Sequence, residues 1–377
     1  MHTPSNTHPE AHRLVEQART LPRIPEEGVQ GYSRNEPQLI REVNEKMSSR
    51  PDIEQLIGGN DLRIMFDNHR NHAAFMGFIF KYGEYESLAR SLPWVYRAYT
   101  SQGFDPQYFP QAIGAWMEAV QKNVASNQEI LKVYEWIRSS HESIIRASRA
   151  EPGQSVKVPG KWTELQKEFL QSLLRGEPKD SLEIAHQAVI DASTLKGFML
   201  QVIQPSMYEI GAMWESGEIS VAREHLASSV VSTVLSSLYA TTELPGSKKG
   251  HVLVAATSNE YHELGAWILS IMLEISGWHV SYLGANMPIS DLVRFTLETE
   301  PDILALSVAL VFNLENSEEI IRQIKDQNKN IKIILGGMAC SQLSWACRGM
   351  RADYIISSAE QGLKTMEKIW KEKQKLS

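Results

Sequence analysis

Apolar residues recur along the first two thirds of the chain at the three-to-four spacing of amphipathic helices. Between residues 31 and 150 prolines and glycines interrupt this spacing, which predicts an all-helical, aromatic-rich domain whose size permits a globin-like fold. Residues 163–242 show the same spacing and predict four further helices, a four-helix bundle. After residue 250 short runs of β-formers alternate with helical segments. This alternation predicts a Rossmann-like or flavodoxin-like domain, a doubly wound parallel sheet of five strands.

Polar segments rich in proline and glycine mark the expected boundaries. Residues 1–30 are predicted to form a mobile tail, and residues 151–162 and 243–250 are predicted to be linkers. The last domain is therefore expected to span residues 251–377. Its strands are predicted near 251–256, 279–283, 303–308, 331–335 and 353–356, and its helices near 263–276, 289–298, 315–328, 340–348 and 360–373.

The loop after the first of these strands carries the strongest candidate for chemistry. His262 lies between the apolar run 251–256 and the following helix, and ligands of open α/β sheets bind outside the carboxyl ends of the strands. A neutral imidazole binds transition metals, and a carboxylate such as Glu260 can hold its second nitrogen and fix the tautomer. Gly265, one turn later, lets a bulky group pass close to the backbone.

Three later motifs occur in order: LGANMP at 283–288, ALSVAL at 305–310 and ILGG at 334–337. Together with the His262 loop they resemble the cobalamin-binding domain of methionine synthases, corrinoid methyl carriers and B12-dependent light sensors. The resemblance implies that His262 is the lower axial ligand of cobalt, in place of the cofactor's own benzimidazole. It also implies that Ser307, Gly336 and Gly337 line the slot for the displaced nucleotide tail.

Two residues depart from the family pattern. The carboxylate near the ligand is usually Asp in the family, whereas here it is Glu260. Two residues after the slot serine, related domains often carry a larger or hydroxyl side chain, whereas here the residue is Ala309. Neither departure removes the ligand, but the longer Glu260 is expected to hold the imidazole differently.

The predicted bundle contains Trp214, then nine residues, then the adjacent pair Glu224 and His225. This spacing resembles the cap of B12-dependent photoreceptors, in which the tryptophan and the Glu-His pair pack around the 5′-deoxyadenosyl group of adenosylcobalamin. An indole can shield a large upper ligand, and a carboxylate can accept hydrogen bonds from ribose hydroxyls. In several light-sensing relatives a histidine follows the tryptophan, whereas this chain has Glu215, so the upper cobalt ligand after photolysis is an open question.

Composition limits the remaining function classes. The net charge of -7 and the absence of a recognisable helix-turn-helix, zinc-finger or basic-arm signature argue against direct nucleic-acid binding. The two cysteines, Cys340 and Cys347, provide no disulfide scaffold or cysteine-rich metal site. The N-terminus lacks an apolar leader and no apolar run reaches membrane-spanning length, so a cytoplasmic, soluble protein without a membrane partner is expected.

The aromatic residues of the helical domain allow two interpretations. They form either an aromatic core or dimer face, or a pocket for a flat conjugated ligand with His69, His72 or His141 as polar contact. The arrangement resembles photocobilins, which pair a B12 module with biliverdin. Since no cysteine precedes Cys340, a thioether-linked bilin in this domain is excluded.

The sequence therefore predicts a photoreceptor rather than an enzyme. Light would cleave the cobalt–carbon bond of adenosylcobalamin and change cap contacts, with a light-dependent homo-oligomer or a separate signalling partner as output, and with biliverdin as a second chromophore in the photocobilin interpretation. The alternatives are a corrinoid methyl carrier for a methyltransferase and a light-independent cobalamin sensor. A B12-dependent mutase is disfavoured because the chain encodes no recognisable substrate barrel.

Overall fold

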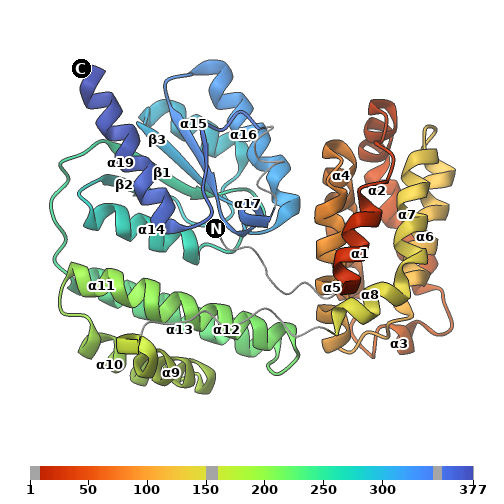
Figure 1. Cartoon of the computed structure of the whole chain (residues 1–377), viewed down its shortest axis with the longest axis horizontal. Helices are drawn as coiled ribbons and strands as arrows, with labels where there is room; N and C mark the ends of the chain where they lie inside the picture. Colours follow the sequence, from red (N-terminus) through yellow and green to blue (C-terminus); the bar gives the residue numbers. More distant parts are fainter. Residues whose placement is uncertain (1–8, 150–159, 343–349, 377) are drawn as a thin grey trace. The chain divides into compact units, whose positions relative to one another are not determined.

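The computed structural model describes residues 9–149, 160–342 and 350–376. The chain divides into two compact units (Figure 1). The first comprises residues 1–153 together with 212–219, and the second comprises residues 154–211 and 220–377.

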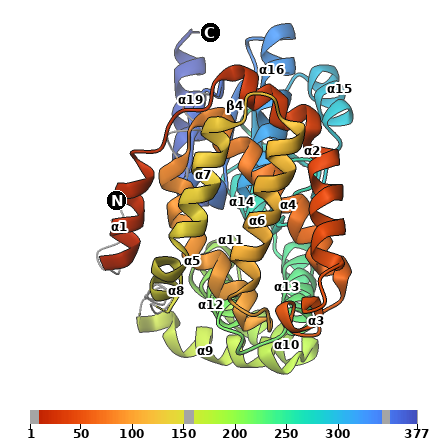
Figure 2. The same ribbon diagram turned by 90° about the vertical axis from the view of Figure 1, so that its right-hand side faces the viewer.

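The described part of the first unit is helical, which confirms that prediction. Helices α2, α4, α6 and α7 run side by side in Figure 2 and pack in the pairs α2–α4, α2–α6 and α6–α7. These helices bury aromatic side chains such as Trp116 and Tyr134, which are at most 1% exposed, as both the aromatic-core and the ligand-pocket interpretations expect. The helices are α1 (Pro9–Ala18), α2 (Glu26–Ser48), α3 (Ile53–Leu56), α4 (Leu62–Tyr82), α5 (Tyr85–Ser101), α6 (Tyr108–Asn123), α7 (Gln128–Ser139) and α8 (His141–Ser148).

The predicted mobile tail over residues 1–30 is wrong for its described part. Residues 9–18 form α1, whose apolar face buries Leu14, Val15 and Ala18 against α5 and α8. Three apolar side chains at helical spacing are enough to dock a short helix on a preformed surface, although the segment is polar on average. Residues 1–8 lie outside the described residues.

The second unit begins with the predicted four-helix bundle. The bundle consists of the helices α9 (Gly160–Arg175), α10 (Pro178–Ala188) and α13 (Val221–Thr241) and of one continuous helical segment, α11–η1–α12. This segment consists of α11 (Ala192–Phe198), one π-helical turn η1 (Met199–Ile203) and α12 (Gln204–Glu215), and the end of α12 passes into the first unit.

The predicted linker 151–162 is corrected at one end. Residues 160–162 belong to α9, because the Trp162 ring packs closely against Gly197 of α11. Residues 151–159 lie outside the described residues.

The remaining residues form the expected doubly wound sheet, drawn in cyan to blue in Figure 1. All four strand pairs are parallel, in the order β2-β1-β3-β4-β5. The elements are β1 (His251–Ala256), α14 (Leu264–Ile275), β2 (His279–Tyr282), α15 (Ile289–Thr299), β3 (Ile303–Ser307), the 3₁₀ turn η2 (Val311–Asn313), α16 (Leu314–Gln327), β4 (Lys332–Gly336), α17 (Met338–Gln342), β5 (Tyr354–Ile355) and α19 (Ala359–Leu376). Residues 343–349, which include most of the helix predicted near 340–348, lie outside the described residues.

The sheet order positions the candidate site. Helices α14 and α19 bury one face of the sheet around Trp278, Leu269 and Met366. The chain moves outward from β1 to β2 and then crosses back to β3, so β1 and β3 are neighbours from which the connections leave in opposite directions. In doubly wound sheets such a switch point, at the carboxyl ends of the two strands, is the usual place for ligand binding. The His262 loop directly follows β1 there.

Candidate cofactor-binding site

The centre of the site is a hydrogen-bonded pair, His262 and Glu260, in the loop between β1 and α14. The Glu260 carboxylate is fully buried, and its Oε1 accepts hydrogen bonds from His262 Nδ1 at 2.7 Å and from the His262 backbone N–H at 3.0 Å. The His262 side chain remains 61% exposed. Because Nδ1 donates to Glu260, Nε2 is the ring nitrogen that can bind a metal ion.

The second oxygen of Glu260 is held by the next loop of the sheet. Oε2 accepts from the backbone N–H groups of Ala309 and Leu310, both at 2.9 Å, and from Asn313 Nδ2 at 3.1 Å. Burial by itself would raise the pKa of this carboxyl, but the hydrogen bonds from His262, the Leu310 amide and Asn313 lower the pKa to about 2. The site therefore contains a permanent buried negative charge that faces an imidazole.

The negative charge of Glu260 changes the pKa of the His262 imidazole. The hydrogen bond to Glu260 raises the pKa of His262, and the Glu224 carboxylate adds a smaller contribution in the same direction. Glu224 is on the first turn of α13, so the structure brings this predicted cap residue into the electrostatic environment of His262. Glu224 Oε1 also accepts from Ser228 Oγ at 2.9 Å. Its neighbour His225 is 76% exposed, with Nδ1 3.9 Å from Glu224 Oε2.

The predicted slot residues lie at the same edge of the sheet. Ser307 ends β3 and is in register with Gly336 at the end of β4. Gly337 has φ +105°, and a Cβ there would lie 2.2 Å from the Val308 carbonyl oxygen, so a larger residue is excluded. A Cβ at Gly336 would collide with the Ile356 side chain. Both glycines thus have a packing reason of their own, and their role in a nucleotide slot stays a prediction.

Gly265 differs from these two glycines. It occupies the first turn of α14, and a Cβ there would meet no atom of the described residues within 4 Å. Packing within this part of the chain therefore does not require glycine at this position. This open space agrees with a bulky group passing near the backbone.

Three asparagines that were not predicted as site residues form hydrogen bonds between the loops at the carboxyl ends of the strands. Asn286, after β2, accepts through Oδ1 from the Asn259 N–H at 2.9 Å. Asn313 Nδ2 also donates to the Asn259 carbonyl at 3.1 Å, and Asn316 Nδ2 donates to the Ser258 carbonyl at 2.9 Å. Asn286 belongs to the LGANMP motif, so a sequence signal existed for it. Asn313 and Asn316 carried no such signal.

The predicted cap tryptophan belongs to the first unit. Trp214 is half-buried at the end of α12, and its ring centroid lies 6.5 Å from that of Trp94 on α5. The next residue, Glu215, forms an ion pair with Arg97 of α5, whose Nε donates to Oε1 at 2.7 Å. Arg97 also donates to the Ser148 carbonyl at 3.1 Å. Glu215, at the position of the second histidine of light-sensing relatives, is thus engaged within the helical unit.

The helical unit buries several polar groups. His69 Nδ1 lies 2.6 Å from Asn44 Oδ1 and His69 Nε2 lies 2.9 Å from Tyr108 Oη, so both ring nitrogens are engaged. Burial lowers the pKa of His69 to about 4 and that of His72 to about 3. His72 Nε2 and Trp136 Nε1 are buried and have no hydrogen-bond partner among the residues that the structure describes. His141 Nδ1 is 3.1 Å from Tyr96 Oη.

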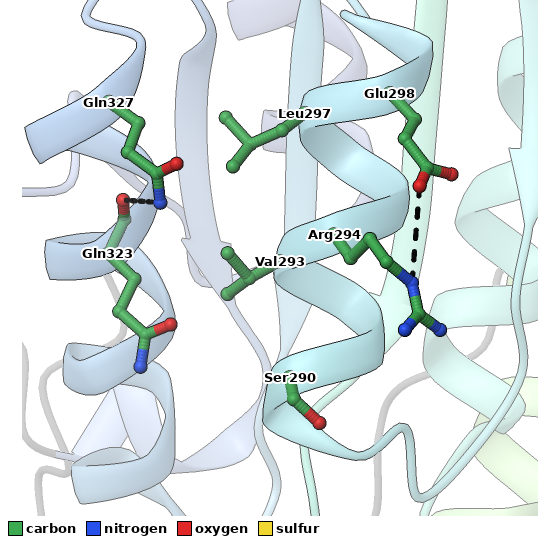
Figure 3. A pocket seen from close by; sticks show the side chains of 7 residues that line it. All are labelled: Ser290, Val293, Arg294, Leu297, Glu298, Gln323 and Gln327. Atoms are coloured by element: carbon green, nitrogen blue, oxygen red, sulfur yellow. Dashed lines mark hydrogen bonds and ion pairs between the residues drawn. The ribbon is translucent and has the colours of Figure 1, made fainter.

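A separate surface groove runs between α15 and α16 (Figure 3). Val293 and Leu297 form its apolar floor, and Gln323 and Arg294 lie on opposite helices beside it. None of the predicted site residues lines it. Among the described residues no group of three metal-binding side chains converges, and no described helix is long and apolar enough to cross a bilayer.

Two protein-family models match the sheet domain and the helical bundle of this chain. The B12 binding domain family matches residues 250–366, and a second family, also described as a B12 binding domain, matches residues 165–239. The first match covers the sheet with His262. The second covers most of the helical bundle that precedes it.

Curated relatives fall into two groups. The HTH-type transcriptional repressor CarA of Myxococcus xanthus is 27% identical over 271 residues, which cover 70% of this chain and 90% of CarA. The repressor CarH of the same organism is 30% identical over 148 residues, which cover 39% of this chain and 49% of CarH. Dimethylamine corrinoid protein 3 of Methanosarcina acetivorans is 25% identical over 164 residues, 43% of this chain and 76% of that protein. Because two of these relatives are named helix-turn-helix repressors, the expectation of no nucleic-acid binding is not supported.

Proposed function

Since this chain belongs to the B12-binding photoreceptor family, we propose that it senses light through adenosylcobalamin with His262 as the lower axial ligand of cobalt. One observation carries the proposal: Glu260 holds His262 Nδ1 and leaves Nε2 on an exposed ring at the switch point of the sheet. A corrin already supplies four nitrogen ligands, so a single imidazole with a fixed tautomer suits it. The cofactor supplies a cobalt–carbon bond that visible light can break.

The chain's own residues bind and orient the cofactor in this proposal. Glu260 fixes His262, while Gly265, Ser307, Gly336 and Gly337 border the nucleotide tail. Glu224, His225 and Trp214 contact the adenosyl group on the upper face. Loss of that group would remove the partner on which these cap side chains pack, and a ligand with different affinity for two cap arrangements shifts the balance between them. The output is a change in homo-oligomer or partner contacts, without an enzymatic reaction.

The test is an absorption spectrum of the full chain reconstituted in darkness with adenosylcobalamin, before and after green illumination. We expect conversion to a hydroxocobalamin-like spectrum, and loss of axial ligation in His262→Ala. A light-inert spectrum would favour the two alternatives, a corrinoid methyl carrier or a dark cobalamin sensor. The similarity to dimethylamine corrinoid protein 3 keeps the methyl carrier as the principal alternative.

We also propose biliverdin as a second chromophore in the helical unit. The observation that favours it is that His72 Nε2 and, separately, Trp136 Nε1 are buried and have no hydrogen-bond partner among the described residues. Such groups are rare in packed interiors and indicate a missing polar partner. A far-red absorption band after addition of biliverdin, reduced in His72→Phe, is the expected result. An unchanged biliverdin spectrum in the presence of the protein would contradict this extension.

A further inference from the structure

One face of α5 contacts residues 212–219, the end of α12 and the turn after it, within the first compact unit. Three residues of α5 spaced i, i+3 and i+7 form this surface, which we call the α5 contact face: Trp94, Arg97 and Ser101. Residues at this spacing lie on one side of a helix. Each of the three meets a different residue of segment 212–219, so the segment is fixed at several points along its length.

The first two contacts are made by side chains. The ring centroids of Trp94 and Trp214 lie 6.5 Å apart. Arg97 donates to Glu215 Oε1 from Nε at 2.7 Å and also from Nη2. Its Nη1 donates to the Ser148 carbonyl at the end of α8 at 3.1 Å, so the guanidinium is itself held in place. Because Arg97 is 22% and Glu215 15% exposed, water screens this ion pair less than a pair on the open surface.

The third contact is a close approach of the backbone at Gly217. This residue has φ +79°, and a Cβ there would lie 3.0 Å from Ser101 Cβ and 3.2 Å from the Ser101 carbonyl oxygen. Glycine fits both the positive φ and the short distance without strain. The Gly217 N–H donates to the Trp214 carbonyl at 3.0 Å, and the Glu218 N–H donates to the Met213 carbonyl at 2.8 Å. Trp214 therefore belongs to a turn that is fixed both internally and against α5.

We propose that the α5 contact face positions Trp214 for the adenosyl group, so that the helical unit sets the preference of the cofactor site for an adenosyl upper ligand. This inference rests on the proposed function in placing Trp214 on the upper face. Trp94, Arg97 and Ser101 are positioning residues, since they act through Trp214 and its neighbours. An indole that is already fixed loses little conformational entropy when a ligand packs on it, and this strengthens binding.

The coupling between the α5 contact face and the adenosyl group works in both directions. If the face strengthens the binding of adenosylcobalamin by a given factor, adenosylcobalamin strengthens the attachment of segment 212–219 to the face by the same factor. Release of the adenosyl group after illumination consequently loosens this segment on α5. The helical unit thus receives the light signal through α5, and the cap tryptophan is the residue that transmits it.

The chain offers a matched control in the same unit. Arg146 of α8 donates from Nε to Glu10 Oε1 of α1 at 3.1 Å, in an ion pair that includes no residue of segment 212–219. Arg97→Ala and Arg146→Ala thus each remove an arginine that pairs with a glutamate of another helix. Only Arg97→Ala removes a contact to the segment. Glu215→Ala removes the same ion pair from the other side, and it serves as the second variant if Arg97→Ala impairs folding.

The experiment uses the full chain in darkness. Titrations with adenosylcobalamin and with hydroxocobalamin give two Kd values for each variant, and the readout is their ratio, because a general loss of structure weakens the binding of both cofactors. Amide hydrogen exchange is then measured at residues 216–218, whose N–H groups donate within the turn. It is compared for the cofactor-free protein, the dark adenosylcobalamin complex and the same complex after green illumination.

For Arg97→Ala and Glu215→Ala we expect about fivefold or greater weakening of adenosylcobalamin binding and less than about twofold weakening of hydroxocobalamin binding. Arg146→Ala is expected to keep the wild-type ratio. In the wild type, exchange at residues 216–218 should slow when adenosylcobalamin binds and become faster again after illumination. In Arg97→Ala we expect fast exchange in all three states.

An unchanged Kd ratio in Arg97→Ala and Glu215→Ala would overturn the inference. The same holds if Arg146→Ala lowers the ratio equally, or if adenosylcobalamin leaves exchange at residues 216–218 in the wild type unchanged. The photochemical proposal fails on a different result, a light-inert spectrum of the wild-type protein with adenosylcobalamin. Since the Kd ratio is measured in darkness, it does not depend on that outcome.

Discussion

Glu260→Gln tests whether the size of the side chain at position 260 or its hydrogen-bond acceptors are needed to hold His262. The substitution preserves the size of the side chain but replaces one accepting oxygen by an NH₂ group. The wild-type carboxylate accepts five hydrogen bonds, two from His262 on Oε1 and three from the β3–α16 turn on Oε2. A glutamine can accept on one side only. We expect its oxygen to face the three donors of the turn, so the NH₂ group faces His262.

This orientation reverses the tautomer of His262. Next to an NH₂ donor, Nδ1 becomes the acceptor, and the proton moves to Nε2, which can then no longer bind cobalt. Restoring the binding tautomer leaves a donor without its acceptor, which costs about 1–3 kcal/mol when the group is buried. Because the His262 ring is 61% exposed, water satisfies part of the loss. We therefore expect about 1–2 kcal/mol, which corresponds to about 5- to 30-fold weaker binding.

The assay combines two measurements on the same protein. The ¹⁵N chemical shifts of His262 in cofactor-free protein report the tautomer, and the absorption of bound hydroxocobalamin reports axial ligation. Glu260→Asp is the control, because it keeps the negative charge and hence the Nδ1–H tautomer but shortens the reach to the turn. Full ligation and wild-type affinity in Glu260→Gln, with the Nδ1–H tautomer retained, would refute this account of the site.

Three further results are expected. Trp214→Ala should weaken adenosylcobalamin binding more than hydroxocobalamin binding, because in the proposed site the indole packs on the adenosyl group. Equal losses in a parallel titration would exclude Trp214 from the upper face. Arg97 and Glu215 are 22% and 15% exposed, so Arg97→Glu should lower the free energy of unfolding by about 2 kcal/mol in denaturant unfolding. The double variant Arg97→Glu with Glu215→Arg should recover part of this loss. No recovery would show that the two side chains are not coupled. Burial raises the pKa of Glu84 from 4.5 to about 7, so its stabilising neutral form is present below pH 4.5 and is lost as pH rises through 7. Glu84→Gln should consequently be more stable than the wild type at pH 8 by about 1–3 kcal/mol, with equal stability near pH 4, and a constant difference across this range would contradict the shift.

The sheet could be predicted closely from the sequence because each strand is a short apolar run between polar turns. β1 is predicted and observed at residues 251–256, and β3 is predicted at 303–308 and observed at Ile303–Ser307. Such runs are defined by local burial on both faces, which the sequence displays directly. Helix α1 was missed because its burial depends on a surface formed by α5 and α8, elements that lie far along the chain.

In the site, too, contacts between residues close in sequence were predicted, whereas contacts between distant segments were missed. His262 and Glu260 are two residues apart, so their hydrogen bond could be expected from spacing alone. Asn313 contacts Glu260 across 53 positions, and Arg97 contacts Glu215 across 118. Contacts of this kind depend on the register of parallel strands or on the docking of helices. A single sequence without a family pattern at those positions does not display them.

The two residues that depart from the family pattern, Glu260 and Ala309, are in direct contact. A glutamate is one methylene longer than the usual aspartate, and its Oε2 reaches the backbone N–H of Ala309 at 2.9 Å. Position 309 supplies its donor through the backbone, so this contact does not depend on a hydroxyl side chain there. Asn313 then supplies the remaining donor from the far end of the same turn. The longer carboxylate, the small residue at 309 and the asparagine at 313 thus form one arrangement, in which a change at any one position is expected to require compensation at the others.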